Sequence, residues 1–273
     1  MPKAFVIDVA KCSGCYNCQL ACKDEHVGND WTPYALPQPD IGQFWCRVEE
    51  HVQGTIPKVR IHYIARLCNH CRKPACASVC PEKAIYTRDD GFVIIDPEKC
   101  AGCGECVSAC PYGAIFMNAG LKKAQKCTGC AHLLDNGAKL PRCVEACPTD
   151  AIMFGEEDEL VDQIEGASVS RPETACFPRV YYRNIPGKFI GGTLYDPEEN
   201  EVIIGARCLL HSGGKNWETL SDSYGDFWFN DLPVGLFDLV IEARGYRCKT
   251  FENIKTSNAV NLGDIPLEKD KTN

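Results

Sequence analysis

The sequence predicts an α+β protein in which tandem cysteine-rich modules of short helices and strands precede a small antiparallel β-sandwich. Three observations lead to this prediction. Sixteen of the twenty cysteines fall into four groups of four between residues 12 and 147. Three of these groups end in the same phrase, Cys-Pro-x-x-Ala-Ile, which begins at Cys80, Cys110 and Cys147. From residue 189 onward the chain has no grouped cysteines and contains short apolar runs separated by turn residues.

The repeated phrase indicates an internal structural repeat. A proline directly after the last cysteine is typical of a short helix that ends there and is followed by a turn and a strand. Strands are also predicted before the first cysteine of two groups, at residues 6–8 and 93–96. The turn Asp89-Asp90-Gly91 between two apolar runs predicts a hairpin. The unit is therefore strand, cysteine loop, short helix and strand, and we expect it four times, as two pairs.

The chain is expected to contain two domains and a connector. Residues 1–155 hold all four cysteine groups and carry an insertion at 23–67, whereas residues 188–273 form the sandwich. Residues 156–187 are expected to connect the two and to pack back on the first domain. Strands are expected in the insertion, the connector and the sandwich, at residues 44–50, 58–64, 179–182, 189–195, 206–212, 217–221, 226–230, 237–243 and 248–251.

The composition limits the partners and the compartment. The formal net charge of −8 argues against nucleic acid as a partner, because binding phosphates requires a basic surface. No run of about 18 apolar residues is present, so no membrane helix is expected. The first residues lack the apolar stretch of a secretory signal, so a cytoplasmic location is expected. The alternative is export together with a partner that carries the signal.

The spacing of the cysteine groups is that of iron–sulfur ligands. Residues 100–111 contain the complete pattern Cys-x-x-Cys-x-x-Cys-x-x-x-Cys-Pro. In this pattern three cysteines hold one [4Fe–4S] cluster, and the cysteine before the proline binds the other cluster of a two-cluster protein. The second group has four residues between its second and third cysteines, and the fourth group has twelve, at 131–142. Since both still supply four ligands, four [4Fe–4S] clusters are expected in two-cluster, ferredoxin-like modules.

Each group is expected to give its fourth cysteine to the cluster of a partner group, and this exchange defines four ligand sets. The second and third groups are neighbours and are expected to pair, so the first group pairs with the fourth across them. The sets are Cys12, Cys15, Cys18 and Cys147 (set A), Cys22, Cys127, Cys130 and Cys143 (set B), Cys68, Cys71, Cys76 and Cys110 (set C), and Cys80, Cys100, Cys103 and Cys106 (set D). Zinc bound by four thiolates is an alternative, although it does not require a triplet closed by Cys-Pro. A disulfide scaffold is another, although such scaffolds are small and secreted.

Some residues near the groups are candidates for tuning a cluster. Lys11, Lys99 and Lys126 each precede the first cysteine of a group. A cation there would stabilise a reduced cluster, whereas a solvated lysine at the start of a loop would not, and both interpretations stay open. His70 and His132 are candidates for hydrogen bonds to a cluster sulfur, and a surface or internally bonded histidine is the alternative.

No catalytic residues are expected on this chain. It has neither a dinucleotide-binding nor a phosphate-binding glycine loop, so substrate chemistry is expected on another subunit. Four cysteines lie outside the groups and are expected to be small buried hydrophobic residues: Cys46, Cys176, Cys208 and Cys248.

The four groups, their nested pairing, the run Lys-Cys-Thr-Gly-Cys-Ala-His at 126–132 and the twelve-residue gap before Cys143 form a recognisable combination. In these features residues 1–185 resemble the electron-transfer (beta) subunits of the dimethyl sulfoxide reductase superfamily of molybdenum enzymes. The resemblance implies a heterodimer, or a higher oligomer, with a large catalytic subunit. That subunit would carry molybdenum (or tungsten) bis-pyranopterin guanine dinucleotide and one cluster of its own.

A narrower resemblance rests on residues 124–127, 130–135, 141–143 and 178–182 together with the sandwich. In these segments the chain is similar to the small subunits of the pyrogallol–phloroglucinol transhydroxylase family and of related phenolic hydroxylases and dehydroxylases. The sandwich itself resembles prealbumin-like and carboxypeptidase-regulatory-like modules, for which stability or partner contact is the expected role. The transhydroxylase small subunit has a degraded third group and three clusters, whereas the third group is complete here.

The complete third group bears on the expected function. Transhydroxylation has no net redox change and needs no external electrons, so a full set of clusters favours a phenolic-ring hydroxylase or dehydroxylase, or a related reductase. Three alternatives stay open: the small subunit of a transhydroxylase with no net electron flow, a subunit of a respiratory quinone-linked molybdenum oxidoreductase, and a free polyferredoxin without a catalytic partner.

Overall fold

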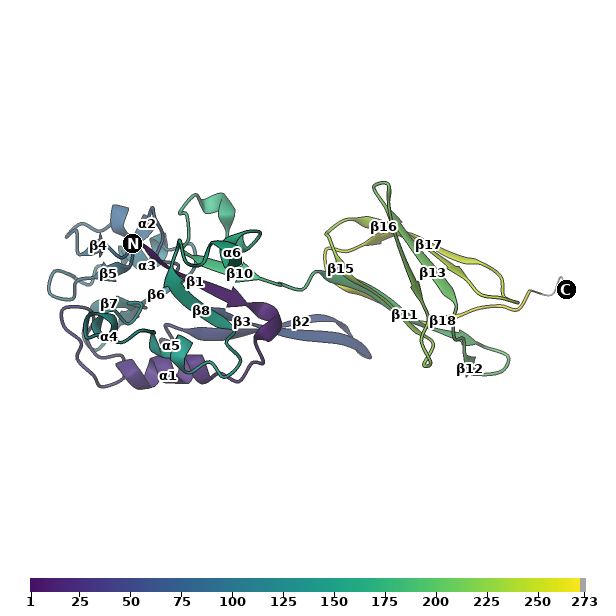
Figure 1. Ribbon diagram of the computed structural model, residues 1–273, viewed down its shortest axis with the longest axis horizontal. Helices are drawn as coiled ribbons and strands as arrows, with labels where there is room; N and C mark the ends of the chain where they lie inside the picture. Colours follow the sequence, from purple (N-terminus) through teal and green to yellow (C-terminus); the bar gives the residue numbers. More distant parts are fainter. Residues whose placement is uncertain (271–273) are drawn as a thin grey trace. The chain divides into compact units, whose positions relative to one another are not determined.

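Figure 1 shows the computed structural model of the chain, which describes residues 1–270. The chain forms two compact units. Unit 1 consists of residues 1–50 and 62–185, and unit 2 consists of residues 51–61 together with those from 186 onward. The grouped cysteines all belong to unit 1. No helix in residues 1–270 has the length and apolar character needed to cross a membrane.

A four-stranded sheet forms the centre of unit 1. Strand β1 (Lys3–Asp8) lies beside β8 (Ile152–Glu156), to which it is antiparallel, and beside β10 (Val180–Arg183), to which it is parallel. The edge strand β9 (Ser168–Val169) completes the order β8-β1-β10-β9. The strand expected at 179–182 is therefore confirmed as β10. The sheet joins the first strand of the chain to the strands that follow the last cysteine group.

Three hairpins and six short α-helices accompany this sheet, and all of them lie in unit 1 except the tip of the first hairpin, residues 51–61. The hairpins pair β2 (Arg47–Thr55) with β3 (Lys58–Arg66), β4 (Ile85–Thr87) with β5 (Val93–Ile95), and β6 (Ile115–Asn118) with β7 (Lys123–Lys126). The pairing of β4 with β5 confirms the hairpin expected across residues 89–91. The helices are α1 (Asn17–His26), α2 (Ala75–Ser78), α3 (Glu105–Ala109), α4 (Ala131–Asp135), α5 (Arg142–Glu145) and α6 (Val161–Ile164).

Prolines flank three short helices that carry cysteines, α2, α3 and α5, whereas α1 has no flanking proline and runs for ten residues. Helices α2 and α5 begin directly after Pro74 and Pro141, which occupy their N-cap positions in an extended conformation. A residue that precedes a proline avoids the helical region. Cys110 illustrates this, because it follows α3 in an extended conformation, with φ −77° and ψ 111°, just before Pro111. The last cysteine of the group therefore points away from the helix that holds the preceding one.

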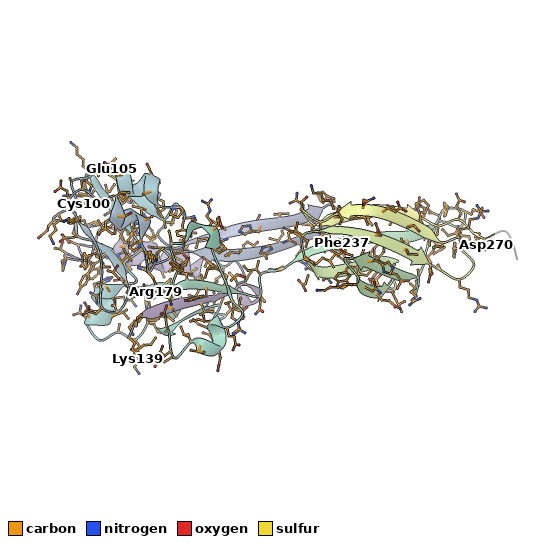
Figure 2. The ribbon with its side chains drawn as sticks, turned by 90° about the horizontal axis from the view of Figure 1, so that it is seen from above. Cys100, Glu105, Lys139, Arg179, Phe237 and Asp270 are labelled. Atoms are coloured by element: carbon orange, nitrogen blue, oxygen red, sulfur yellow. The ribbon has the colours of Figure 1, made fainter. Side chains whose placement is uncertain are left out.

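The core of unit 1 combines apolar side chains with cysteines. Phe5 on β1 packs against Phe92 and Phe154, with ring centroids 6.1 and 5.0 Å apart. Arg179, labelled in Figure 2, is buried and donates hydrogen bonds to the carbonyls of His70 and Gly91. The same core cluster contains several cysteines: Cys18, Cys22, Cys46, Cys68, Cys127 and Cys143, with Cys110 partly buried against it. This core therefore mixes thiols with hydrocarbon and aromatic side chains.

Unit 2 contains two four-stranded sheets. In one sheet β11 (Lys188–Asp196) pairs with β12 (Glu201–Val202), β15 (Asp226–Leu232) and β18 (Val260–Pro266). The other has the order β14 (Lys215–Leu220), β13 (Arg207–Ser212), β16 (Leu236–Glu242) and β17 (Lys249–Lys255). The six strands expected in the sandwich are confirmed, with end points that differ by a few residues.

Two features of unit 2 differ from the expectation. Strands β12 and β18 were not expected, and β18 runs parallel to β11, so the sandwich is not wholly antiparallel. The sequence of β18, Val-Asn-Leu-Gly-Asp-Ile-Pro, contains Gly263 and ends in proline, two residues that strands disfavour. Pairing with the long strand β11 overrides that local preference.

The sandwich core follows the alternation of its strands. On β16, Phe237, Leu239 and Ile241 are buried, while the residues between them are exposed or half-buried. Phe237 is labelled in Figure 2 and packs against Trp217 at a centroid distance of 5.5 Å. Cys208 is fully buried in this core, as expected, whereas Cys248 is exposed, so its expected burial was wrong.

The tip of the β2–β3 hairpin belongs to unit 2. Lys58 is 3% exposed, pairs with Asp226 at 2.6 Å and lies 4.9 Å from the ring of Trp228. Gly54 has φ +83°, and a β-carbon there would lie 2.4 Å from the ring of Phe189. Only glycine fits this close approach without a shift of its neighbours. The insertion thus supplies part of the second unit, although it lies in sequence between two cysteine groups.

Candidate metal centres

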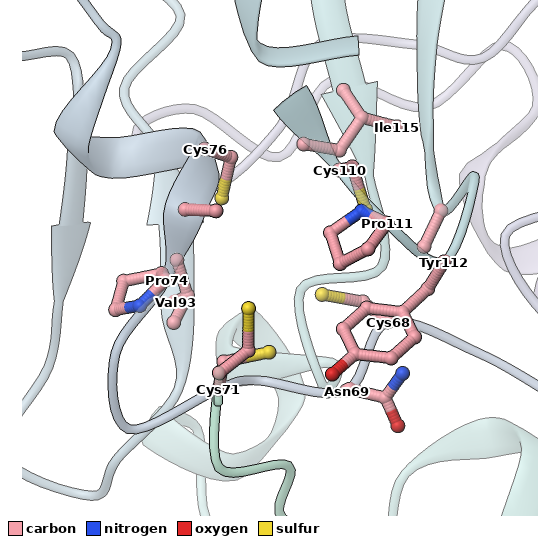
Figure 3. A pocket seen from close by; sticks show the side chains of 13 residues that line it. Cys68, Asn69, Cys71, Pro74, Cys76, Val93, Cys110, Pro111, Tyr112 and Ile115 are labelled. Atoms are coloured by element: carbon pink, nitrogen blue, oxygen red, sulfur yellow. The ribbon is translucent and has the colours of Figure 1, made fainter. Parts of the chain in front are cut away.

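The four cysteines of set C line one cavity, shown in Figure 3. Cys68 and Cys71 lie in the loop after β3 and Cys76 lies on α2, whereas Cys110 comes from the end of the next cysteine group. The cavity is otherwise lined mainly by apolar side chains, including Val93. Four thiols from two separate groups therefore surround one apolar space.

The four cysteines of set D line a second cavity in the same way. Cys100, Cys103 and Cys106 come from the loop after β5 and from α3, and Cys80 comes from the end of the preceding group. Apolar side chains such as Ile85 and Ile95 also line this cavity. The two groups thus exchange their last cysteines, Cys80 and Cys110, as the sequence pattern predicts.

The cysteines of sets A and B are gathered by the contact of α1 with α5 and of β1 with β8. Burial raises the pKa of the Cys12 thiol, and the nearby Cys18, Cys147 and Cys15 raise it further. The last cysteine of the first group has other neighbours. Burial raises the pKa of Cys22 well above its usual value, and Cys127, Cys143 and Cys130 also contribute. The structure therefore places Cys12 near the other members of set A and Cys22 near the other members of set B, and their binding of clusters stays a prediction.

The chemistry of these sites fits an iron–sulfur cluster. Burial raises the thiol pKa to about 12 at Cys76 and Cys127 and to about 11 at Cys106, because a charged thiolate is less stable away from water. A cationic metal core would supply a counter-charge, and its binding would release the thiol protons. In residues 1–270 no three His, Cys, Asp or Glu side chains converge on a single ion. The thiols surround a space, as the separate irons of a cluster require.

Positive φ angles close the cysteine loops. The residue before the second cysteine is Gly14, Gly102 or Gly129 in three groups, each with φ between +66° and +73°. A β-carbon at Gly102 would lie 2.0 Å from the carbonyl oxygen of Lys122, so a larger residue cannot fit there. The second group has His70 at this position, with φ +40°. The tight loop geometry is thus shared by all four groups, although one of them lacks the glycine.

Backbone amides point at several of the cysteine sulfurs. The amides of Ala84 and Ala151 donate to the sulfurs of Cys80 and Cys147, both at 3.3 Å. Both donors follow their cysteine by four residues, so the Cys-Pro-x-x-Ala phrase itself forms the hydrogen bond. Such bonds stabilise a negatively charged sulfur and influence the potential of a cluster.

Two domain families match this chain. The 4Fe-4S dicluster domain matches residues 59–157, and the carboxypeptidase regulatory-like domain matches residues 190–268. The chain is 36% identical to the pyrogallol hydroxytransferase small subunit of Pelobacter acidigallici, over 96% of this chain and 98% of that protein. The chain belongs to the iron–sulfur electron-transfer subunits of the dimethyl sulfoxide reductase family. Its [4Fe–4S] character follows from this membership and from the dicluster domain.

Two further members of the family match over a smaller part of the chain. A subunit of the tetrathionate reductase of Salmonella typhimurium is 34% identical, over 68% of this chain and 74% of that protein. A component of the anaerobic dimethyl sulfoxide reductase of Escherichia coli is 40% identical, over 57% of this chain and 74% of that protein. The match to the pyrogallol hydroxytransferase small subunit is the more extensive of the three, because it extends over nearly the whole chain.

Two cysteines outside the four sets, Cys46 and Cys176, lie close to the grouped cysteines. Cys46 is buried, as expected, but it does more than fill space. Hydrogen bonding with Cys143 and Cys18, together with burial, raises the pKa of the Cys46 thiol well above its usual value. Cys46 therefore lies between sets A and B, and Cys176 lines the cavity of set C. No pattern in the sequence indicates either position, because both depend on contacts between distant segments.

The candidate tuning residues have different surroundings. Lys11 and Lys99 are exposed, and Lys99 pairs with Asp96 at 3.0 Å, whereas Lys126 is 2% exposed. His70 is buried, and its Nδ1 accepts a hydrogen bond from the amide of Val93. His132 is also buried and lies 3.0 Å from a carboxylate oxygen of Glu25. Both histidines thus have protein partners, and hydrogen bonds from them to a cluster sulfur stay a prediction.

Proposed function

We propose that this chain holds four [4Fe–4S] clusters, one in each of sets A to D, and relays electrons to or from a catalytic subunit. That subunit would carry molybdenum (or tungsten) bis-pyranopterin guanine dinucleotide, and its substrate would be a phenolic ring. When bound, each cluster supplies a centre that accepts and gives one electron. The observation that carries the proposal is that sixteen cysteines gather into four sets, each with thiols from two cysteine groups.

Contacts between neighbouring sets support an order A, B, C, D for the electron path. Cys46 contacts Cys18 of set A and Cys143 of set B. Besides burial, Cys68 of set C raises the pKa of Cys127 in set B. Cys106 of set D likewise contributes to the raised pKa of Cys76 in set C. Each set therefore lies next to the following one in this order, as a series of electron carriers requires.

Exposure of the cysteines indicates where electrons would enter and leave. Of the sixteen grouped cysteines, Cys15 and Cys103 are exposed, and they belong to sets A and D. The cysteines of sets B and C are buried, apart from the half-buried Cys110. The two ends of the proposed path thus reach the surface while its middle is kept from water.

The proposal of a phenolic substrate draws on the relative that matches both units of this chain. That relative is the pyrogallol hydroxytransferase small subunit, whose match includes the sandwich. The complete third group, which forms most of set D, favours a hydroxylase or dehydroxylase with net electron flow. The small subunit of a transhydroxylase without net electron flow is the second candidate, favoured by the name of that same relative. A subunit of a respiratory quinone-linked oxidoreductase is the third, suggested by the reductase relatives.

Purification from the native host under anaerobic conditions tests the proposal. We expect a large molybdenum or tungsten protein to co-purify, and about sixteen irons and sixteen sulfides per copy of this chain. Cys103→Ser should leave the complex assembled but stop turnover of a phenolic substrate with an external electron donor. Cys248→Ser is the matched control, because Cys248 is exposed but lies in the sandwich.

Other outcomes of the same experiment identify the alternatives. Turnover that needs no external donor and is unchanged by Cys103→Ser would identify a transhydroxylase. Co-purification with a membrane subunit and reaction with a quinone would identify a respiratory enzyme, and a lone chain would identify a free polyferredoxin. We also propose a cytoplasmic location. A processed signal sequence on the co-purified large chain would instead support export of the complex.

A further inference from the structure

Lys126 is a buried lysine without a carboxylate partner. Its side chain is 2% exposed, and no ion pair joins it to a carboxylate in residues 1–270. Its Nζ donates hydrogen bonds to two backbone carbonyls, those of Val93 and Cys127, the latter at 2.9 Å. The other lysines that precede a cysteine group, Lys11 and Lys99, are exposed. Lys126 therefore stands apart from two residues at equivalent positions.

A buried ammonium group requires compensation. Moving a charge out of water is unfavourable unless an opposite charge lies nearby, and neutral carbonyls offset only part of that cost. No such charge comes from the acidic side chains of the described residues. A negatively charged group in a neighbouring site would keep this lysine charged by supplying the missing compensation.

The surroundings of Lys126 contain two such sites. The carbonyl it binds at Cys127 belongs to a cysteine of set B. The other carbonyl belongs to Val93, which lines the cavity of set C and is held on its amide side by His70. Lys126 thus lies between sets B and C, and its ammonium group binds the backbone at both of them.

We propose that Lys126 is the shared buried counter-cation of sets B and C, and that it raises the reduction potentials of the clusters these sets hold. A [4Fe–4S]²⁺ core with four thiolates carries a net charge of roughly −2, and reduction adds one more negative charge. A fixed positive charge stabilises the reduced form more than the oxidised form. The proposal depends on the proposed function in one respect, which is that sets B and C each hold a cluster.

Substitution of Lys126 with potentiometric titration tests the proposal. Lys126→Gln keeps a hydrogen-bond donor for the carbonyls but removes the charge, and Lys99→Gln is the matched control from an exposed equivalent position. The complex would be titrated with dithionite and followed by electron paramagnetic resonance. In Lys126→Gln we expect two of the four midpoint potentials to fall by at least about 59 mV. For a one-electron step this is a tenfold change in the equilibrium constant of reduction. All four should stay unchanged in Lys99→Gln.

The other outcomes are decisive in the same way. Four unchanged potentials in Lys126→Gln with full iron content, or an equal shift in all four, would overturn the proposal. If Lys126→Gln loses iron, Lys126→Arg decides. If Lys126→Arg keeps its iron, the positive charge is what the sites need. If Lys126→Arg also loses iron, Lys126 has a packing role and the proposal fails. Wild-type protein with far fewer than about sixteen irons would instead count against the proposed function itself.

Discussion

The residue before the second cysteine shows how one backbone position limits a metal site. In three cysteine loops this residue is a glycine with positive φ, and in two of them a β-carbon would strike the ring of Tyr63 or Phe92. At Gly102 the obstacle is the carbonyl oxygen of Lys122, which belongs to the backbone and cannot rotate away. His70 takes this position in the second group, so its loop tolerates a side chain that the others exclude.

A single substitution at this position should therefore remove one cluster. We expect Gly102→Ala to lose the iron of set D, because its β-carbon would lie 2.0 Å from the Lys122 carbonyl oxygen. Iron should fall by about a quarter, from about sixteen to about twelve per chain. Iron analysis with electron paramagnetic resonance measures this loss.

Gly104 provides the control for the residue-scale prediction. It has φ +81°, so alanine there suffers a similar backbone strain of about 1–2 kcal/mol, but no atom lies within 4 Å of its ideal β-carbon. Gly104→Ala should keep the full iron content. Equal iron in the two variants would show that the close contact at Gly102 does not limit the loop.

At the scale of the elements, the exchange of cysteines between α2 and α3 links two cysteine groups. Each short helix holds one cysteine that faces its own loop, and the residue before the following proline carries the next cysteine to the neighbouring cavity. The two groups therefore cannot assemble independently. The reason is that each cavity has only three thiols until the other group is in place.

Paired substitutions test this exchange. Cys110→Ser and Cys76→Ser belong to one cavity, so the double variant should damage one cluster, as either single variant does. Cys110→Ser combined with Cys106→Ser should damage two clusters, although both cysteines belong to the same sequence group. Counting unpaired spins and iron in the single and double variants distinguishes the two cases. The reverse result, with two clusters damaged by Cys110 and Cys76 together, would mean that each group binds its own cluster.

At the scale of the whole molecule, the two units have cores of different composition. The core of unit 1 contains many of the grouped cysteines, whereas the core of unit 2 is made of residues such as Leu194, Phe227 and Phe237, and its cysteine, Cys208, belongs to no set. Metal binding is therefore expected to contribute to the free energy of folding of unit 1 but not to that of unit 2.

Removal of iron should affect the thermal unfolding transitions of the two units differently. With a chelator and an oxidant we expect the unfolding transition of unit 1 to disappear and that of unit 2 to remain, because burial of apolar side chains stabilises the sandwich without metal. Differential scanning calorimetry of the complete chain before and after iron removal measures both. Loss of both transitions on iron removal would contradict this view.

Some features of this protein could be predicted from local sequence. The hairpin at 89–91, strand β10 and six sandwich strands are confirmed, because turn residues and apolar alternation act over a few residues. The combination of cysteines in each set also agrees with the spacing. In three groups a proline after the fourth cysteine turns it away from its own loop, whereas Cys22 of the first group lies within α1 and is followed by Lys23. The binding of four clusters stays a prediction.

Other features depend on contacts between segments far apart in the chain. Nothing in the run Gln125-Lys126-Cys127 distinguishes its lysine from Lys11 or Lys99, yet Lys126 is buried by the packing of β7 against β5. Cys46 and Cys176 reach the ligand sets, the hairpin tip at 51–61 joins unit 2, and β18 pairs with β11 only through the tertiary fold.

The amino-acid sequence by itself therefore determined the type of site, the number of thiols and their grouping, since cysteine spacing and proline act through the covalent chain. The tertiary structure alone decided which charges and extra thiols surround those sites. Burial and electrostatic environment arise from elements brought together across the chain, and no local pattern records them.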